Sequence, residues 1–401
     1  MRLSLAALGN RVVLPLVAVG ILVFGLVSAR RLPPSTHLAS VSVSQDLHSC
    51  VTKAEAGERF ACFRVLLHPR LDAQGPRAVL QDLDTLQTAN ASFGAYCHEM
   101  AHILGRYWIA KGRSLLDGLR EGSSVCHSGF YHGMVERVIQ GESTDRAEVE
   151  HISPDDLRAK VPTVCTAQTL GTESRNFRFQ CLHGLGHAVV FALGYRLPSA
   201  VELCDTLEDD WSRHSCYGGA FMENITGPER DRRMLRAGDP HYPCSMVAEK
   251  YRDSCYGMQT SWMREMGLSF ERIVEECRTV KVGRLSCFRS LGRDASSDVR
   301  QEGPTKYSSL CASLPPEERT ECIQGVVYAL ADHTWDGRYA NAFCASFAEA
   351  ERQEECFGYA HQHLTVALEQ PVEKVANGCR ALASSPDVCL RVLANQGSGA
   401  H

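Results

Sequence analysis

The cysteines constrain this chain more than any other feature of its sequence. There are 18 of them in 401 residues, an even number, and all lie from Cys50 onward. A reducing cytosol keeps thiols reduced, so this usage predicts disulfide bonds and an oxidising compartment. The part of the chain that carries the cysteines is therefore expected to be extracytoplasmic.

The spacing of the cysteines predicts how they pair. Counted back from the C-terminus they form tight pairs, whose second members recur at steps of 32 to 39 residues: Cys379/Cys389, Cys344/Cys356, Cys311/Cys322, Cys277/Cys287, Cys244/Cys255 and Cys204/Cys216. That step is the period of a two-helix repeat. The pattern extends to Cys165/Cys181 and Cys50/Cys62, which leaves Cys97 and Cys126 to pair by elimination. This connectivity is a hypothesis from spacing, because nine bonds allow many others.

Apolar residues before the cysteines have helical spacing. In the segments 197–204, 270–277 and 372–379 they fall at i, i+3, i+4 and i+7 and end at a cysteine, as on one helix face. Ser199 with Glu202 has the spacing of a capping box, and Pro371 suits a first helical turn. A glycine follows the second cysteine in several pairs, where it is expected to let the first helix approach the second closely. The predicted fold is all-α, a solenoid-like array of disulfide-stapled helical hairpins.

In its period, and in having one cysteine pair per hairpin, the segment from about residue 165 to 395 resembles the disulfide-bridged Sel1-like and tetratricopeptide repeat proteins. Cys287-Phe-Arg-Ser-Leu-Gly is most similar to the second helix of those repeats. The resemblance is architectural and carries no particular functional residue. It implies a solenoid, and a protein or peptide partner on the repeat surface.

The N-terminus contains a hydrophobic segment. Residues 12–28 carry no charge and are bracketed by Arg11 and Arg30-Arg31. This is typical of a signal anchor or a signal peptide over residues 1–31, and the length favours an uncleaved anchor. The expected protein is attached to a membrane through residues 12–28, with its C-terminal domain on the extracytoplasmic side, or is secreted if the segment is cleaved.

The chain is expected to divide into four regions after its hydrophobic segment. We expect a linker at 32–45, a histidine-rich helical region at 46–200, a stapled repeat array at 201–395 and a tail at 396–401.

The charge of the chain bears on its partners. The net charge is −5, and no basic run is interleaved with aromatic residues, so no nucleic-acid partner is expected. Sequons at Asn90 and Asn224 predict a glycoprotein if the source is eukaryotic.

Six of the 16 histidines fall in three segments that each begin with a cysteine: Cys97-His98-Glu99-Met-Ala-His102, Cys126-His127-Ser-Gly-Phe-Tyr-His132 and Cys181-Leu-His183-Gly-Leu-Gly-His187. Histidines four apart on a helix point the same way and can hold one ion. His127 and His132 are five apart, so His132 is taken as a ligand and His127 as a supporting residue. The predicted metal ligands are His98, His102, His132, His183 and His187.

The first histidine segment also fits the H-E-x-x-H pattern, in which the glutamate takes a proton from zinc-bound water. Glu99 is therefore the candidate catalytic acid or base of a zinc hydrolase or a copper or iron oxidase. A further ligand would come from one of the other segments or from Glu136. With every cysteine oxidised, the ligands are imidazole and carboxylate, which suit a divalent metal, zinc before copper or non-haem iron.

The alternative is a non-enzymatic, protein-binding scaffold with structural histidines. In that case the neighbouring glycines, Gly129, Gly133, Gly184 and Gly186, serve close helix packing. The matching positions of the three segments, absent from later repeats, favour the metal site. His333, His361 and His363 lie in those later repeats and are expected to be surface or packing residues. Whether the protein is an enzyme stays open.

Overall fold

A computed structural model describes residues 47–141, 152–227 and 230–397. The predicted hydrophobic segment 12–28, the linker and the last residues of the tail lie outside these ranges. Residues Leu47–His401 form one compact unit. Among the described residues no helix combines the length and apolar character needed to cross a membrane.

The described residues form helices and turns with no strand, which confirms the all-α prediction. The N-terminal helices are α3 (Ala56–Gln74), α4 (Pro76–Ala89), α5 (Ala91–Ala110), α6 (Leu115–Glu121), α7 (Gly129–Gln140), α8 (Pro154–Val164), α9 (Ala167–Leu170) and α10 (Arg175–Ala192). The short first helices of the later hairpins are α11 (Leu197–Cys204), α14 (Phe270–Thr279), α16 (Thr305–Ala312), α18 (Arg338–Ala345) and α20 (Val372–Arg380). The second helices are α12 (Asp210–Thr226), α13 (Glu249–Glu265), α15 (Arg284–Glu302), α17 (Pro316–Thr334), α19 (Ala350–Gln362) and α21 (Pro386–Gly397), with a 3₁₀ turn at Arg230–Arg232 and a π-helical turn, η3, at His363–Ala367.

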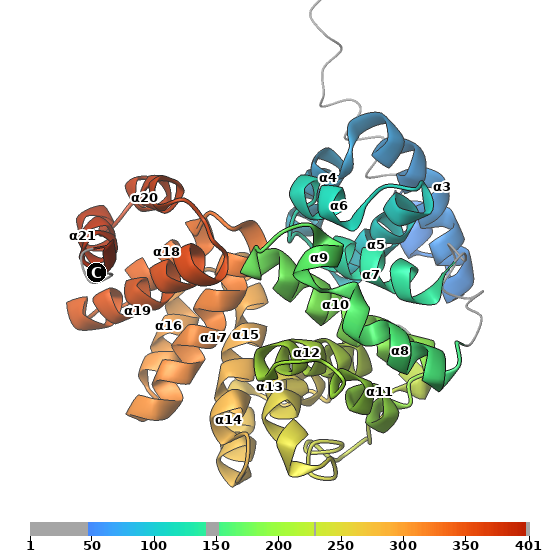
Figure 1. The fold of residues 1–401 in the computed structure, drawn as a ribbon. Helices are drawn as coiled ribbons and strands as arrows, with labels where there is room; N and C mark the ends of the chain where they lie inside the picture. Colours follow the sequence, from blue (N-terminus) through green and yellow to red (C-terminus); the bar gives the residue numbers. More distant parts are fainter. Residues whose placement is uncertain (1–46, 142–151, 228–229, 398–401) are drawn as a thin grey trace, which may run out of the picture. The chain divides into compact units, whose positions relative to one another are not determined.

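The second helices form a continuous row. From α5 through α7, α10, α12, α13, α15, α17 and α19 to α21, each packs against the next, and the short first helices pack against members of this row (Figure 1). The row passes without interruption from the histidine-rich helices into the later repeats. The helices that carry the predicted ligands are therefore neighbours within one array.

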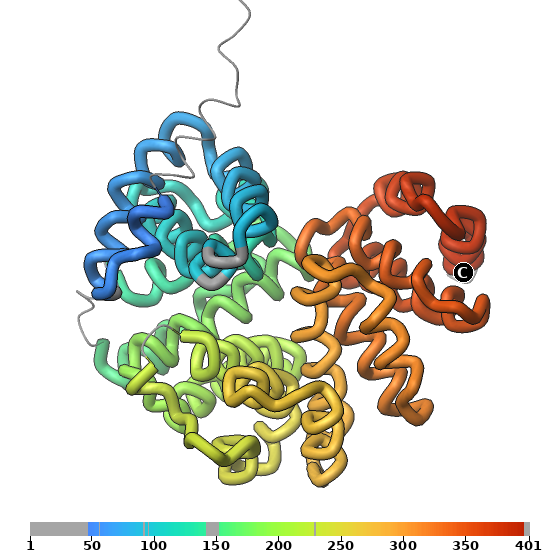
Figure 2. Tube along the Cα trace, turned by 180° about the vertical axis from the view of Figure 1, so that it is seen from behind, coloured from blue at the N-terminus to red at the C-terminus, as the bar shows by residue number. Residues whose placement is uncertain are grey.

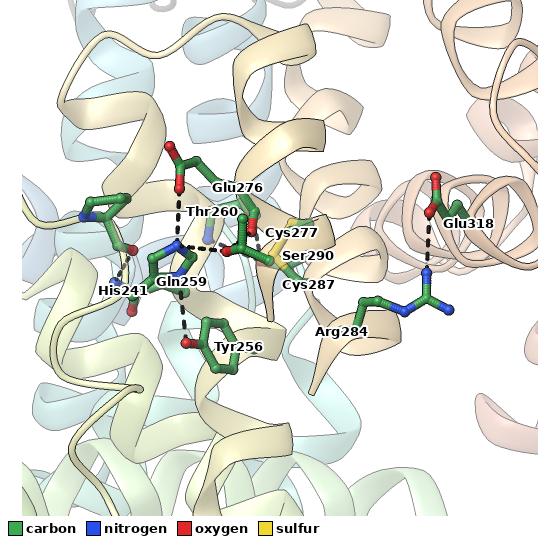
Figure 3. The surroundings of a disulfide bond; sticks show 12 residues. His241, Tyr256, Gln259, Thr260, Glu276, Cys277, Arg284, Cys287, Ser290 and Glu318 are labelled. Carbon is green, nitrogen blue, oxygen red and sulfur yellow. Dashed lines mark hydrogen bonds and ion pairs between the residues drawn. A yellow bond between two sulfur atoms is a disulfide. The ribbon is translucent and has the colours of Figure 1, made fainter. Parts of the chain in front are cut away.

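All nine predicted disulfide bonds are confirmed, with Cα–Cα distances of 5.2 to 5.7 Å. In Figure 3, Cys277 in the last turn of α14 is joined to Cys287 in the first turn of α15. Nearby, Arg284 of α15 pairs with Glu318 of α17 at 3.1 Å, which ties successive second helices together. A bond closing a dozen residues stabilises by about 3 kcal/mol in the chain-entropy model.

Two local predictions of helix starts are wrong. Helix α11 begins at Leu197 with Arg196 as its N-cap, so Ser199 does not cap it. The reason is Pro198, whose fixed φ and missing N–H suit the first turn. Pro371 precedes α20 as its N-cap instead of lying in its first turn.

One hairpin departs from the repeat. Cys244 lies in a turn, so its hairpin lacks a regular first helix.

The glycines of the second helices face a different neighbour from the one predicted. A Cβ on Gly219 of α12 would overlap the carbonyl oxygen of His183 in α10, and one on Gly186 would overlap that of Cys216. Gly292 and Gly325 have the same relation between α15 and α17. These glycines therefore let adjacent second helices approach each other, and not the first helix of their own hairpin.

The sequon at Asn224 is not a surface site. Asn224 is fully buried, and its side chain accepts a hydrogen bond from the backbone N–H of Met234 at 2.7 Å and donates one to that residue's carbonyl at 3.2 Å. A glycan there is incompatible with this fold. Asn90 is exposed.

The row curves, so that its later helices lie against the N-terminal ones. The two opposite views both show this (Figures 1 and 2). At the end of α17, His333 Nε2 lies 3.0 Å from Asp84 Oδ1 of α4. The Trp335 ring stacks on Tyr131 of α7 with centroids 6.1 Å apart. The row therefore has a concave side, where residues of α7, α10, α12, α13, α15 and α17 line one cavity.

Candidate metal centre

Four of the five predicted ligands converge on one point. His98 and His102 of α5, His132 of α7 and His187 of α10 each place a ring nitrogen within 4.8 Å of the others. His102, His132 and His187 are 4, 1 and 0% exposed, and His98 is half-buried. We call these four residues the histidine cluster.

Glycines on α7 bring the cluster together. A Cβ on Gly129 would lie 2.5 Å from the His98 carbonyl oxygen, and one on Gly133 would overlap the His102 carbonyl. Only glycine allows α5 and α7 to pack this closely at the level of the imidazoles. Close helix packing at these glycines was expected if the histidines are structural, and it is present. The same packing also places the histidine rings side by side.

Two rings of the cluster are held by a hydrogen bond from Nδ1 to an oxygen. The acceptors are the Cys126 carbonyl for His98 at 2.8 Å and Glu223 Oε2 for His187 at 2.8 Å. His102 Nδ1 lies at ion-pair distance from Glu136 Oε1, 3.1 Å, without the geometry of a hydrogen bond. An oxygen acceptor at Nδ1 fixes the proton there and leaves the lone pair on Nε2. The Nε2 atoms of His98 and His102 lie 3.0 Å apart, at hydrogen-bond distance. The four rings thus place nitrogen atoms around a common centre.

His132 is the exception, because neither of its ring nitrogens has a hydrogen-bond partner within the described part of the chain. Leaving a buried polar group unsatisfied costs about 1–3 kcal/mol. Burial, and then the neighbouring His187, hold the pKa of His132 well below the usual 6.5. The ring is therefore neutral, which is the form that binds a metal.

The two carboxylates behind the cluster are themselves fixed. Glu136 accepts from Arg106 at 3.2 Å, and Arg106 also donates to Gln140 at 2.6 Å. Glu223 accepts from the Tyr195 hydroxyl at 2.5 Å. Glu136, considered as a further ligand from the sequence, instead lies beside the His102 ring, 3.1 Å from its Nδ1.

Sequence reasoning missed Glu223 and the Cys126 carbonyl. Glu223 had a signal, because it lies seven residues after Cys216 on the apolar face of α12 and is 2% exposed. The Cys126 carbonyl had no signal in the sequence, because a pattern of side chains does not show where backbone groups point. It is aimed at His98 by a left-handed run at residues 126–128, with φ of 57, 53 and 62°.

His183 is not brought into the cluster. It lies one turn before His187 on α10, and its Nε2 is 3.4 Å from the sulfur of Met222. A turn of helix moves a side chain by about 5 Å along the axis, which carries His183 past the level of α5. His127 also lies outside the cluster, in the left-handed turn before α7.

The cluster borders two cavities with no lining residue in common. The smaller, of about 410 Å³, is bounded by His98, His102 and Glu99. The larger, of about 560 Å³, lies on the concave side of the row and is lined by His132, His183 and residues from α10 to α17. Glu99 is thus at the cluster's edge, facing space that a small molecule can fill.

A second group, His361 with Cys379 and Cys389, is not a thiolate metal site. The two cysteines form a disulfide, and His361 Nε2 lies 3.5 and 3.4 Å from their sulfurs. His361 and His333 are both buried, so they are the packing residues that the sequence allowed.

The fold and the site together define an all-α, disulfide-stapled helical array in which four imidazoles converge from three adjacent helices. Comparison of the chain with protein-family models, curated proteins and solved structures finds no match.

Proposed function

We propose that the chain is an extracytoplasmic metal-binding protein whose ion is held by His98, His102, His132 and His187. One observation carries the proposal. His98 and His187 are oriented by hydrogen bonds at Nδ1, and His132 is buried without a hydrogen-bond partner among the described residues. A cation at the centre would satisfy all four rings.

The charge around the cluster supports a cation. Glu136 and Glu223 are 0 and 2% exposed and lie beside the rings of His102 and His187, and Arg106 pairs with Glu136 at 3.2 Å. A carboxylate behind an imidazole raises the basicity of that ring as a metal ligand.

Zinc is the ion that this donor set favours. Four imidazole nitrogens suit tetrahedral zinc, and they also suit copper or non-haem iron. Thiolate ligation is absent among the described residues because every cysteine there is in a disulfide.

We also propose that the protein is attached to a membrane through residues 12–28, or is secreted after cleavage there.

A catalytic role rests on the smaller cavity. Glu99 lines it together with His98 and His102, so a substrate in the cavity would contact a carboxylate next to the centre. A divalent ion bound there supplies Lewis acidity, and Glu99 is positioned to exchange a proton as acid or base. The protein is then a metal-dependent enzyme.

The second candidate is a binding scaffold, the role implied by the resemblance to helical repeat proteins. The concave cavity lined by helices α7 to α17 favours it. In that role the histidines are structural, and the protein binds a peptide or protein without holding a metal.

Elemental analysis separates the two. The chain is produced in an oxidising host without a histidine tag, and a double variant, His102→Ala with His187→Ala, is prepared beside it. We expect about one equivalent of zinc, copper or iron, lost in the double variant. His241→Ala is the matched control, because His241 is also paired with a glutamate, Glu276, at 3.0 Å. A folded protein without metal supports the scaffold.

A further inference from the structure

His183 and Met222 form an unusual contact beside the cluster. His183 Nε2 of α10 lies 3.4 Å from the Met222 sulfur of α12. His183 is 8% exposed and Met222 is half-buried. Both line the larger cavity, so a small ion can reach them from solvent.

The His183 ring lies against α12, since a Cβ on Gly218 would lie 3.5 Å from its Nδ1. A neutral imidazole carries its proton on one ring nitrogen and a lone pair on the other, and a thioether sulfur is an acceptor. When the proton is on Nδ1, Nε2 and the sulfur are two acceptors that face each other, and a cation between them would stabilise both.

The spacing fits such a cation. Bonds of about 2.0 Å from metal to nitrogen and about 2.3 Å to sulfur place these atoms roughly 3.4 Å apart at an angle of roughly 104°, close to tetrahedral. The observed 3.4 Å needs no side chain to move.

We propose that His183 and Met222 form a second metal subsite that takes a monovalent copper ion. A thioether paired with a neutral imidazole is a soft, uncharged donor set, which selects copper(I) over zinc. The subsite goes beyond the proposed histidine centre, because it uses two side chains outside the cluster.

A neighbouring methionine provides the control. Met258 lines the same cavity, but its sulfur accepts a hydrogen bond from the Arg293 guanidinium. Its lone pairs are therefore engaged. Met222→Leu and Met258→Leu both remove only a sulfur at nearly constant volume, a change that cores tolerate well.

The test uses the full chain, loaded anaerobically with copper(I) from its acetonitrile complex. X-ray absorption at the copper edge should show a sulfur neighbour in the wild type and in Met258→Leu, and none in Met222→Leu. No described cysteine is free, so methionine is the expected source of that sulfur. Copper(I) affinity, measured by competition with bicinchoninate, should fall at least tenfold in Met222→Leu alone.

Three results would overturn the subsite: no sulfur neighbour in the wild type, the same signal and affinity in Met222→Leu, or equal losses in both variants. Zinc content is measured on the same samples. Zinc retained by Met222→Leu shows that the histidine cluster is intact. Failure of the cluster proposal would instead appear as an absence of zinc from the wild type.

Discussion

At the scale of single residues, the four imidazoles of the cluster differ in what holds them. His187 donates to a carboxylate and His98 to a backbone carbonyl, His102 Nδ1 lies 3.1 Å from a carboxylate, and His132 has no hydrogen-bond partner among the described residues. A carboxylate at Nδ1 raises the basicity of the ligand, so its loss should weaken metal binding without removing a ligand.

Glu223→Gln tests this dependence. The amide keeps the shape of the side chain but removes the negative charge behind His187, and we expect metal affinity to fall roughly 10–100-fold with the fold retained. Competition with a chromophoric chelator measures the change. Glu276→Gln, which alters the partner of His241, should leave the affinity unchanged. Equal affinities for Glu223→Gln and the wild type would contradict the role given to Glu223.

His361 is one of the buried histidines that make the stability of the fold depend on pH. It is fully buried against the Cys379–Cys389 disulfide, and burial lowers its pKa to about 4. The unfolded chain has the ordinary pKa of 6.5, so below that pH the unfolded state binds the proton more readily. The stability that His361 contributes is present above pH 6.5 and is lost as pH falls toward about 4.

Denaturant unfolding of the metal-free protein at a series of pH values checks this. Between pH 6.5 and about 4 the wild type should lose up to about 1.4 kcal/mol per pH unit more than His361→Gln. The comparison with the variant removes the contributions of other buried histidines. Parallel pH profiles for the two proteins would show that His361 is protonated without cost.

At the scale of elements, the sequence predicted the helices and disulfides well, because both depend on local spacing. Segments 197–204, 270–277 and 372–379 became α11, α14 and α20 within two residues. Partners distant along the chain were not predicted. Nothing in a single sequence shows that Gly219 faces α10, that Glu223 reaches His187, or that one helical turn separates His183 from the cluster.

Gly133→Ala tests whether helix contact forms the site. Its Cβ would overlap the His102 carbonyl and push α7 away from α5. We expect a destabilisation of about 1–3 kcal/mol and loss of bound metal. Gly358→Ala is the control, because a Cβ there meets only the end of Gln396 at 3.8 Å, and alanine should stabilise α19 slightly. Thermal unfolding and metal content are measured together. Normal metal content in Gly133→Ala would mean that the α5–α7 contact does not shape the site.

At the scale of the whole described unit, the curved row is closed by contacts between distant segments. Besides the pair of His333 with Asp84, Glu369 after η3 accepts hydrogen bonds from the Ser174 hydroxyl at 2.5 Å and the Arg175 backbone N–H at 2.9 Å. These contacts hold the end of α17 against α4, and the segment after η3 against the start of α10. The disulfides close only short loops and cannot do this.

Asp84→Ala should loosen that closure. It removes one of the two groups at His333 Nε2 and leaves the Arg300 guanidinium at 3.0 Å, and the loss of a hydrogen bond to a charged group costs about 1.5–3 kcal/mol. Hydrogen exchange should therefore rise in α4 and at the end of α17, with the nine disulfides and the exchange of α14 unchanged. Thr85→Ala, one residue away on the exposed side of α4, is the control. Unchanged exchange in Asp84→Ala would assign the closure to other contacts.

The most direct test of the account is anomalous diffraction at the zinc, copper and iron edges from crystals of the chain purified without chelator. We predict one peak inside the histidine cluster, with the imidazole nitrogens of His98, His102, His132 and His187 at about 2.0–2.1 Å. Ordered density without anomalous signal at that point, with the four rings hydrogen-bonded to water, would contradict the metal centre and leave the concave cavity as the functional surface.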